Sequence, residues 1–379
     1  MAFNFGTPEF LPDRTVLLTT DVAIIGETVG SSMTTIEGGL FPFFGVTKAK
    51  TRISGIHFVS PLVSAIIMIA STGAEILRNR ITNVVGDFLP FLGLSEGRGI
   101  KFLGNGDPDG AITGRVVVAD NVIEDMHADL SDAIVFDAVA ADVVITRNRV
   151  DTVQSSGLLL IDSAGTVTIA ANHIVPGPGD PGEFSFGNGM TIVGSRDASY
   201  SITANRVVAD NPSADGIFLV GDIAPIERAV VSGNHVSLGG SNFGGVTFED
   251  NVSDSRVSRN TVDGVGATAF ALAGSGFATS PVASANVLAA NDVTDFAASF
   301  AHVFLDAHTE ANTIVGCHGT IVDLGTGNRA LACAGSGVAA RASVGAEGGV
   351  RSPRTLRHTI AVSPGLWALP GIAEGVRGG

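Results

Sequence analysis

The residues best suited to acid/base chemistry fall in two nearby parts of the sequence. The segment EDMHADLSD (124–132) combines one histidine with several carboxylates and precedes a short apolar stretch that ends in an aspartate. Carboxylates tune the pKa of a neighbouring histidine or lysine, and such groups serve as general acids and bases. The candidate catalytic residues are Lys101, His127, Asp129, Asp132 and Asp137. The competing interpretation is a solvated acidic loop with one incidental histidine.

A second, weaker group of polar residues lies further along the chain. His302, Asp306 and His308 are close in sequence, and Glu249 would lie two repeats away. Histidine and carboxylate can bind a divalent metal, but this spacing matches no strong metal motif. We therefore predict no metal ligands. The sequence also lacks a Gly-x-Ser-x-Gly nucleophile elbow, a phosphate loop and a dinucleotide fingerprint, so we expect no cofactor.

Charge and hydropathy restrict the class of partner. The net charge of −15 argues against a nucleic-acid partner, and the presence of only three lysines weighs against polyanionic substrates. Mean hydropathy is +0.37, yet no run of 18 apolar residues occurs, so we expect no membrane span. The first residues, MAFNFGTPEF, show no secretory signal, which predicts a cytoplasmic protein for the sequence as it stands.

An asparagine recurs inside apolar stretches along most of the chain. The pattern is aliphatic-x-x-Asn-x-aliphatic, and successive copies lie between 21 and 42 residues apart. The copies centre on Asn79, Asn121, Asn148, Asn172, Asn205, Asn234, Asn260 and Asn291, with a degenerate ninth at Asn312. A position that recurs in every repeat indicates a role in the fold, because functional sites do not recur in this way. We expect each asparagine to occupy a left-handed corner and to hydrogen-bond to the next copy.

Each repeat also contains a short alternating strand that begins with a small residue, such as GIKFL (99–103), GLLLI (157–161) and GIFLV (216–220). Alternation with a period of two and Gly/Asn/Asp punctuation predict strands and turns, and no segment has a helical period. Such short strands cannot bury a face alone, so repeats must stack to share one core.

With these two signatures the chain resembles the right-handed parallel β-helix proteins of the pectin-lyase-like superfamily. The resemblance covers residues 15–334 and implies an all-β, single-stranded right-handed parallel β-helix of about ten coils with an asparagine corner ladder. In that family each coil has three strands, and asparagine is common at the corner between the second and third. We therefore predict a β-helix over residues 1–334 and a Gly/Ala/Arg-rich tail over 335–379 that is flexible or docks on the helix.

The resemblance implies that ligands lie along the outer face of the first strands. The catalytic signatures of the family cannot be placed on that face, so no family activity is carried over. Alternation predicts that the outward residues there are mostly apolar. The candidate ligand-binding residues on these strands are Leu103, Val135, Leu159, Ile161, Thr191 and Phe218; aromatic residues of the flanking loops, Phe88, Phe91, Phe184 and Phe186, would wall a cleft. These loops would equally well pack back on the helix.

Three functions remain open at this point. The first, implied by the resemblance, is binding or processing of a glycan-type ligand in the first-strand groove. The second is a metal-independent lyase or isomerase acting on a small, largely apolar molecule. The third is a non-catalytic scaffold that uses the apolar face for a homo-oligomer or another partner. If the protein is an enzyme, we expect a lyase, isomerase or glycoside hydrolase that works by acid/base catalysis.

Overall fold

The structure is a computed structural model. It describes residues 2–4, 15–29, 32–39, 42–45, 48–89, 94–104, 112–128, 131–153, 156–177, 187–194, 198–210, 214–240, 244–274, 282–316 and 319–331. The chain divides into two units, residues 1–343 and 344–379. The tail expected over residues 335–379 lies outside the described residues, so the boundary at residue 334 stays a prediction. Every described element is a β-strand, and none is a helix that could cross a membrane.

Successive turns of the chain, here called coils, contribute strands to three stacks. The first stack contains β2 (Val16–Leu18), β6 (Phe43–Gly45), β9 (Ser64–Met68), β14 (Arg98–Leu103), β17 (Ile134–Asp137), β20 (Leu158–Ile161), β23 (Met190–Val193), β26 (Ile217–Val220), β30 (Gly244–Glu249) and β39 (Ile321–Asp323). The second contains β3 (Val22–Ile25), β7 (Lys50–Ser54), β10 (Gly73–Leu77), β15 (Arg115–Ala119), β18 (Asp142–Thr146), β21 (Gly165–Ala170), β24 (Ala198–Thr203), β28 (Val230–Ser232), β32 (Arg256–Ser258), β35 (Val287–Ala289), β38 (Thr313–Val315) and β40 (Arg329–Leu331).

The third stack contains β1 (Ala2–Asn4), β5 (Ser32–Glu37), β8 (Ile56–Val59), β11 (Arg80–Val84), β16 (Val122–Met126), β19 (Arg149–Val153), β22 (His173–Pro176), β25 (Arg206–Ala209) and β29 (His235–Gly239). Two long strands, β33 (Thr261–Ala273) and β36 (Phe296–Leu305), pair with both the third and the first stack. Short elements complete the set: β4 (Thr28–Val29), the β12 (Asp87–Leu89) and β13 (Leu94–Glu96) hairpin, and β27 (Ile226–Glu227), β31 (Val252–Ser253), β34 (Ala283–Ser284) and β37 (Thr309–Glu310).

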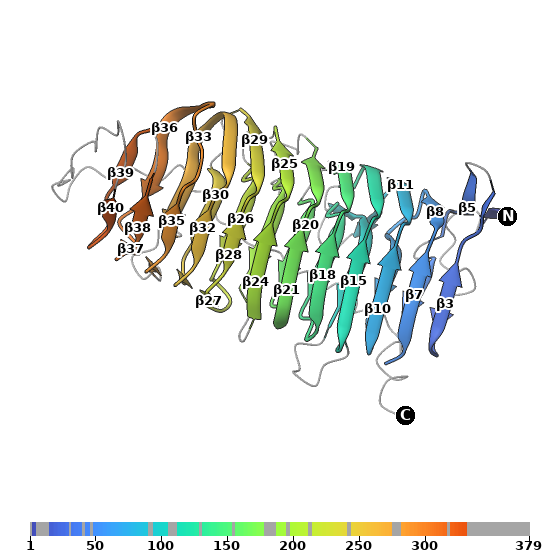
Figure 1. Cartoon of the computed structure of the whole chain (residues 1–379). Coiled ribbons are helices and arrows are strands. Elements are labelled where there is room, and N and C mark those ends of the chain that lie inside the picture. Colours follow the sequence, from blue (N-terminus) through green and yellow to red (C-terminus); the bar gives the residue numbers. More distant parts are fainter. Residues whose placement is uncertain are drawn as a thin grey trace. The chain divides into compact units, whose positions relative to one another are not determined.

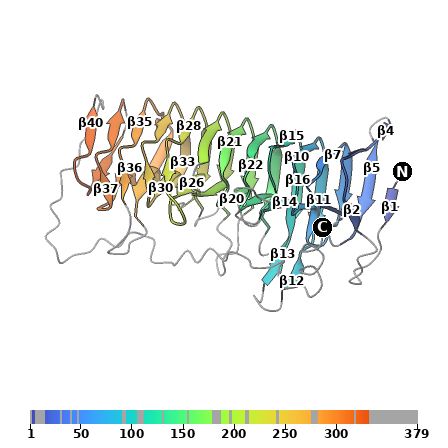
Figure 2. The same cartoon turned by 90° about the horizontal axis from the view of Figure 1, so that it is seen from below.

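Strands within each stack are parallel and follow the order of the sequence. The second stack forms one sheet of twelve strands, from β3 to β40, in which each strand pairs with the equivalent strand of the neighbouring coils. Figure 1 shows this order as a continuous colour series along the stack. The chain is a parallel β-helix, as the repeat predicts, with slightly more coils than the expected ten. Figure 2 shows the β12–β13 hairpin projecting from the side of the β-helix.

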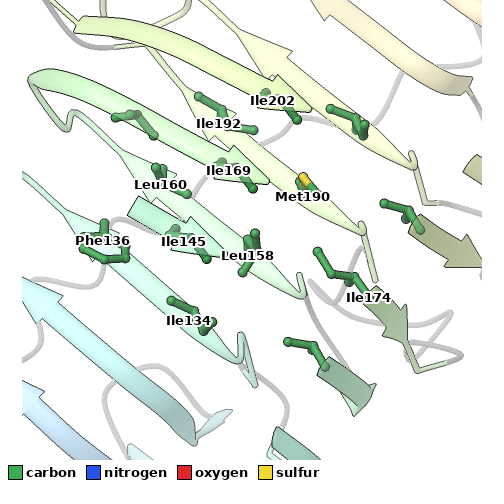
Figure 3. Close-up of a cluster of buried hydrophobic side chains, with 14 of the residues drawn as sticks. Ile134, Phe136, Ile145, Leu158, Leu160, Ile169, Ile174, Met190, Ile192 and Ile202 are labelled. Carbon is green, nitrogen blue, oxygen red and sulfur yellow. The ribbon is translucent and has the colours of Figure 1, made fainter. Parts of the chain in front are cut away.

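The core is a column of aliphatic side chains shared by all coils. On the second strands, Ile76, Val118, Ile145, Ile169 and Ile202 are register neighbours, and all are fully buried. Figure 3 shows Ile145, Ile169 and Ile202 repeating in successive coils opposite residues of the first strands. Burying one such side chain contributes about 2 kcal/mol. Because each coil buries its apolar residues only against its neighbours, stability is distributed along the stack.

The asparagines form a buried ladder at the corner between second and third strands. The Asn148 side-chain oxygen accepts the backbone N–H of Asn121 at 3.0 Å and its Nδ2 group at 2.9 Å. In turn, Asn148 Nδ2 donates to Val118 O and to the side-chain oxygen of Asn172. The same pattern links Asn172, Asn205, Asn234, Asn260 and Asn291. Each amide therefore satisfies backbone and side-chain groups that have no access to water.

The left-handed corner residue is the one before each asparagine, which corrects the sequence-based expectation. Arg78, Asp120, Arg147 and Arg259 have φ between 53° and 58°. None of the eight ladder asparagines has a positive φ. The asparagine is thus required for its side-chain amide. The positive φ of the corner belongs to the preceding residue, whose type varies from coil to coil.

Asn312 is not a ninth member of this ladder. It directly precedes β38 instead of following it, and its side-chain oxygen accepts the backbone N–H of Asn286 at 2.9 Å. Asn312 donates to Asn328 in the same way. These three residues form a second ladder at the opposite end of the second strands. No second strand comes directly before Asn312, which is consistent with the absence of an aliphatic residue three positions before it.

Small residues open the first strands because the next coil lies very close to them. A Cβ atom on Gly216 would lie 2.6 Å from the carbonyl oxygen of Gly245, and one on Gly99 would lie 2.5 Å from that of Ala133. These distances are shorter than van der Waals contact, so the glycines permit the close approach of neighbouring coils.

Candidate functional site

The first strands align the predicted site residues in register. Lys101 on β14 pairs with Val135 on β17, which pairs with Leu159 on β20. Thr191 on β23 and Phe218 on β26 continue this column. In the adjacent column Leu103 pairs with Asp137, and Asp137 pairs with Ile161. Alternation in the sequence therefore assigned these residues correctly to shared columns.

Most of these columns are buried within the single chain. Val135, Ile161, Thr191 and Phe218 are all less than a tenth exposed, with Phe218 at 1%. The exceptions are Leu103, Asp137 and Leu159, which are half-buried and lie in three consecutive coils. We call these three residues the Asp137 window. Among the described residues of these two columns, these three have partly exposed surfaces.

A compact group of four charged residues lies behind this window. Lys101 Nζ donates to Glu96 Oε1 at 2.7 Å, and Arg98 Nε lies 3.4 Å from the same oxygen. The Arg98 guanidinium also forms an ion pair with Asp132. All four residues are at most 6% exposed. Two positive and two negative groups cancel, which allows such charges to be buried together.

The surroundings shift the pKa values of two carboxyl groups in opposite directions. Burial raises the pKa of Asp137, with a further increase from Asp162, and Lys101 opposes this only in part. Burial also acts to raise the pKa of Glu96, but Arg98 and Lys101 together outweigh it and hold the pKa below its usual value. Asp137 therefore retains its proton to higher pH than an ordinary aspartate, whereas Glu96 stays ionised. Such a divergence is typical of acid/base sites.

Asp132 has a structural role as well as its ion pair. Its Oδ1 accepts the backbone N–H of Ser156 at 2.9 Å, just as the side-chain oxygen of Asn188 accepts the N–H of Asp215 at 2.7 Å. These residues precede the small residue that opens each first strand, so they form a further polar ladder at that corner. The arrangement favours Asp132 as a residue that positions Arg98 over one that reacts with a ligand.

The remaining predicted residues are placed as follows. His127 is exposed, its backbone N–H donates to Val84 O, and no side-chain contact joins it to Lys101 in the described ranges. Thr191 is hydrogen-bonded to Ser156 and Asn188, which leaves its hydroxyl engaged. Asp129, Phe91, Phe184 and Phe186 lie outside the described residues, and Phe88 belongs to β12 without a described side chain.

The second polar group is held by backbone contacts. His302 Nδ1 accepts the N–H of Thr320 at 3.0 Å, and Asp306 accepts the N–H groups of Gly274 and His308. Burial raises the pKa of Asp306. Within the described ranges no three His, Cys, Asp or Glu residues converge in a manner suited to a metal ion.

Sequence reasoning missed Glu96 and Arg98. Both have the same parity as Ile100 and Phe102, whose side chains fill the core, so alternation would place them inside. Both precede Gly99, and Arg98 is the first residue of β14. The polar residue before each strand-opening glycine or alanine was the available signal.

Comparison with known proteins adds little beyond the fold. No protein-family model matches the sequence, and no curated protein matches it. Two solved structures of DFA-IIIase from Arthrobacter chlorophenolicus A6 are similar: a complex with GF2 (12% identity, 80% of this chain and 79% of the other, TM-score 0.37) and the mutant C387A (13% identity, 88% and 86%, TM-score 0.40). At that level of likeness neither structure assigns a ligand or a residue role to this chain.

Proposed function

We propose that this protein binds and processes a glycan-type ligand at the Asp137 window. The observation that carries the proposal is the half-buried carboxyl of Asp137, whose pKa is raised by burial in front of a buried, charge-balanced group. A protonated carboxyl that a ligand can reach is suited to donate a proton to a glycosidic oxygen.

A second carboxyl, that of Asp162, interacts electrostatically with Asp137. Asp162 follows Ile161, the register partner of Asp137 on the next coil, and its charge contributes to the raised pKa of Asp137. Glycoside hydrolysis uses two carboxyl groups on either side of the bond, one as the acid and the other as base or nucleophile. We assign the acid to Asp137 and the second role to Asp162. Lys101, held by Glu96, would stabilise negative charge nearby.

The apolar members of the window would provide the surface for a sugar ring. Leu103 and Leu159 are half-buried in the coils on either side of Asp137. Ligand sites commonly combine an apolar lining with a few oriented polar groups. Because Val135, Thr191 and Phe218 are buried, the first-strand face offers no observation in favour of the apolar-molecule lyase or the scaffold. A homo-oligomer through that face stays a prediction.

The test is a screen of neutral oligosaccharides followed by kinetics on any that bind or react. Products would be detected by mass spectrometry and reducing-end release. We expect Asp137→Asn to lower turnover at least a hundredfold, since general acid catalysis contributes about 10²–10⁴-fold. The same should hold for Asp162→Asn, and Lys101→Met should lower turnover less.

The matched control is Asp151→Asn. It makes the same chemical change on β19, in the third stack and outside the Asp137 window. It should leave turnover unchanged. Full turnover in Asp137→Asn would contradict the proposed acid. Binding without turnover in the wild-type protein would reduce the proposal to a glycan-binding module, and a screen with neither would contradict it.

A further inference from the structure

A second site is formed on the outer face of the second strands, away from the Asp137 window. A hollow of about 420 Å³ lies over β3, β7, β10 and β15. These strands lie side by side at the blue end of the stack in Figure 1. Five of the ten residues that line it are charged: Asp21, Lys50, Arg52, Glu75 and Arg115. We propose that this hollow binds a small organic anion that carries a carboxylate or phosphate group together with hydroxyl groups.

The hollow exists because a glycine separates two long cationic side chains. Lys50, Gly73 and Arg115 begin consecutive second strands, and Lys50 is the register partner of Gly73. Strands in a sheet are spaced by about 4.8 Å, so the Lys50 and Arg115 backbones lie about 10 Å apart across the gap. Gly73 has no side chain to fill this gap. The small residues Ala23 and Ala74 also line the hollow.

The positive charges of the hollow are only partly compensated. Lys50 and Arg115 are exposed, and neither makes an ion pair with any described residue. Arg52 lies 3.5 Å from Glu75 through one guanidinium nitrogen, but its Nε is buried and finds no acceptor within the described ranges. Asp21 is occupied, because its Oδ1 accepts the backbone N–H of Lys50 at 2.8 Å. An anionic group between Lys50 and Arg115 would accept hydrogen bonds from both of these side chains.

The overall negative charge of the protein repels anions. With a net charge of −15, an anion gains nothing from the general field of the protein. The affinity must therefore come from the three cations that line the hollow. Glu75, half-exposed at the rim beside Arg52, is placed to accept hydrogen bonds from hydroxyl groups. This pairing of cations and a carboxylate favours a hydroxylated anion over a simple inorganic ion.

Isothermal titration with four probes tests the proposal. Glucose 6-phosphate and glucuronate distinguish a phosphate from a carboxylate source, inorganic phosphate tests the anionic group alone, and glucose is the neutral control. We expect 1:1 binding of at least one of the two sugar anions, tighter than inorganic phosphate, with an affinity that falls as salt is added. Binding of glucose as tight as that of the sugar anions would contradict the proposed role of charge.

The decisive variant is the double substitution Lys50→Gln/Arg115→Gln. Both residues are exposed, so the fold should persist, and the affinity should fall at least tenfold. The matched control is Arg329→Gln, an exposed arginine that likewise begins a second strand, β40, but lies outside the hollow. It should bind as the wild type does. Equal affinity in the double variant, or no binding of any anionic probe at millimolar concentration, would overturn the proposal. Asp137→Asn should leave this binding unchanged, which separates the two sites.

Discussion

The asparagine corner and the first-strand face are built from the same coils but differ in how they use polar residues. At the corner, each coil repeats one residue type in one geometry, so that Asn148 and Asn172 make equivalent hydrogen bonds. On the first-strand face, Lys101 is followed in register by Val135 and Leu159. Among the described residues of the neighbouring coils, the ion pairs of Lys101, Glu96, Arg98 and Asp132 have no equivalent.

This difference separates stability from candidate function. A group that repeats in every coil distributes its stabilisation along the stack, and its loss at one coil should unfold or loosen that region. A group that occurs in only one coil can be replaced while the repeated interactions of the stack remain. The raised pKa of the half-buried Asp137 implies that its ionised form opposes stability, as is common for functional residues. The corner therefore explains why the chain stacks, and the window identifies where its chemistry would be.

The largest effect should come from Asn148→Ala at the corner. The substitution removes the acceptor for the Asn121 N–H and the donor to Val118 O, and both of these hydrogen bonds are buried. Each buried group left without a partner costs about 1–3 kcal/mol, so the free energy of unfolding should fall by about 3–5 kcal/mol. Urea unfolding measures this loss.

A suitable control is Asn83→Gly, at an exposed asparagine with φ of 56° where glycine is accepted without strain. It should change the free energy of unfolding by less than about 1 kcal/mol. Equal losses in the two variants would contradict the special role of the buried ladder.

A somewhat smaller effect is expected for Asp132→Ala in the charged group. The change removes one of the two carboxylates paired with Arg98 and leaves Ser156 N–H without its acceptor, so a loss of about 3 kcal/mol is expected. Asp132→Asn retains an acceptor for Ser156 and should lose clearly less. If both variants lose equally, the hydrogen bond to Ser156 contributes nothing, and the assignment of Asp132 to a corner ladder is wrong. Urea unfolding of both variants at neutral pH provides the comparison.

An effect of opposite sign is expected for Asp137→Asn. Burial raises the pKa of Asp137 in the folded state. The contribution of its protonated form to stability is therefore fully present below the pKa of an aspartate in the unfolded chain, about 3.9. This contribution is lost as pH rises through the folded-state pKa. The asparagine variant has no proton to lose. It should therefore be more stable than the wild type at pH 7, and the gain should disappear in acid.

Thermal unfolding of both proteins from pH 3 to pH 8 measures this. Glu96 has a depressed pKa and should act in the opposite sense, so that its contribution is lost as pH falls. A wild type more stable than Asp137→Asn at pH 7 would show that Asp137 is a structural carboxylate.

The smallest effect is expected for Glu124→Gln, which removes the exposed ion pair with Arg80 on the third strands. Exposed pairs contribute about 0–1 kcal/mol, so the free energy of unfolding should change by about 0.5 kcal/mol or less. A loss comparable to that of Asn148→Ala would mean that the outer surface, and not the ladder, holds neighbouring coils together. Urea unfolding in low and high salt checks the assignment.

The sequence predicted the regular parts of the molecule well and the irregular parts poorly. Alternation and repetition were sufficient to place Lys101, Val135 and Leu159 in one column, because neighbouring coils share a register. They were not sufficient for Arg98, whose parity assigns it to the core although its side chain forms ion pairs with Glu96 and Asp132. Nor did they show that Phe218 is buried.

The two corner asparagines Asn291 and Asn312 show a similar limit. Both lie near aliphatic residues, yet they occupy opposite ends of their second strands and belong to different ladders. Only the strand pairing distinguishes them. The left-handed φ at Arg147, next to Asn148, was likewise hidden, because either residue type is compatible with the corner and the amide ladder decides which one turns.

The measurement that tests the central claim most directly is the glycan turnover of Asp137→Asn per folded molecule at neutral pH, beside the wild type and Asp151→Asn. The account predicts a loss of at least about a hundredfold in Asp137→Asn, with its stability retained or increased, and no loss in Asp151→Asn. Undiminished turnover in a folded Asp137→Asn protein would contradict it.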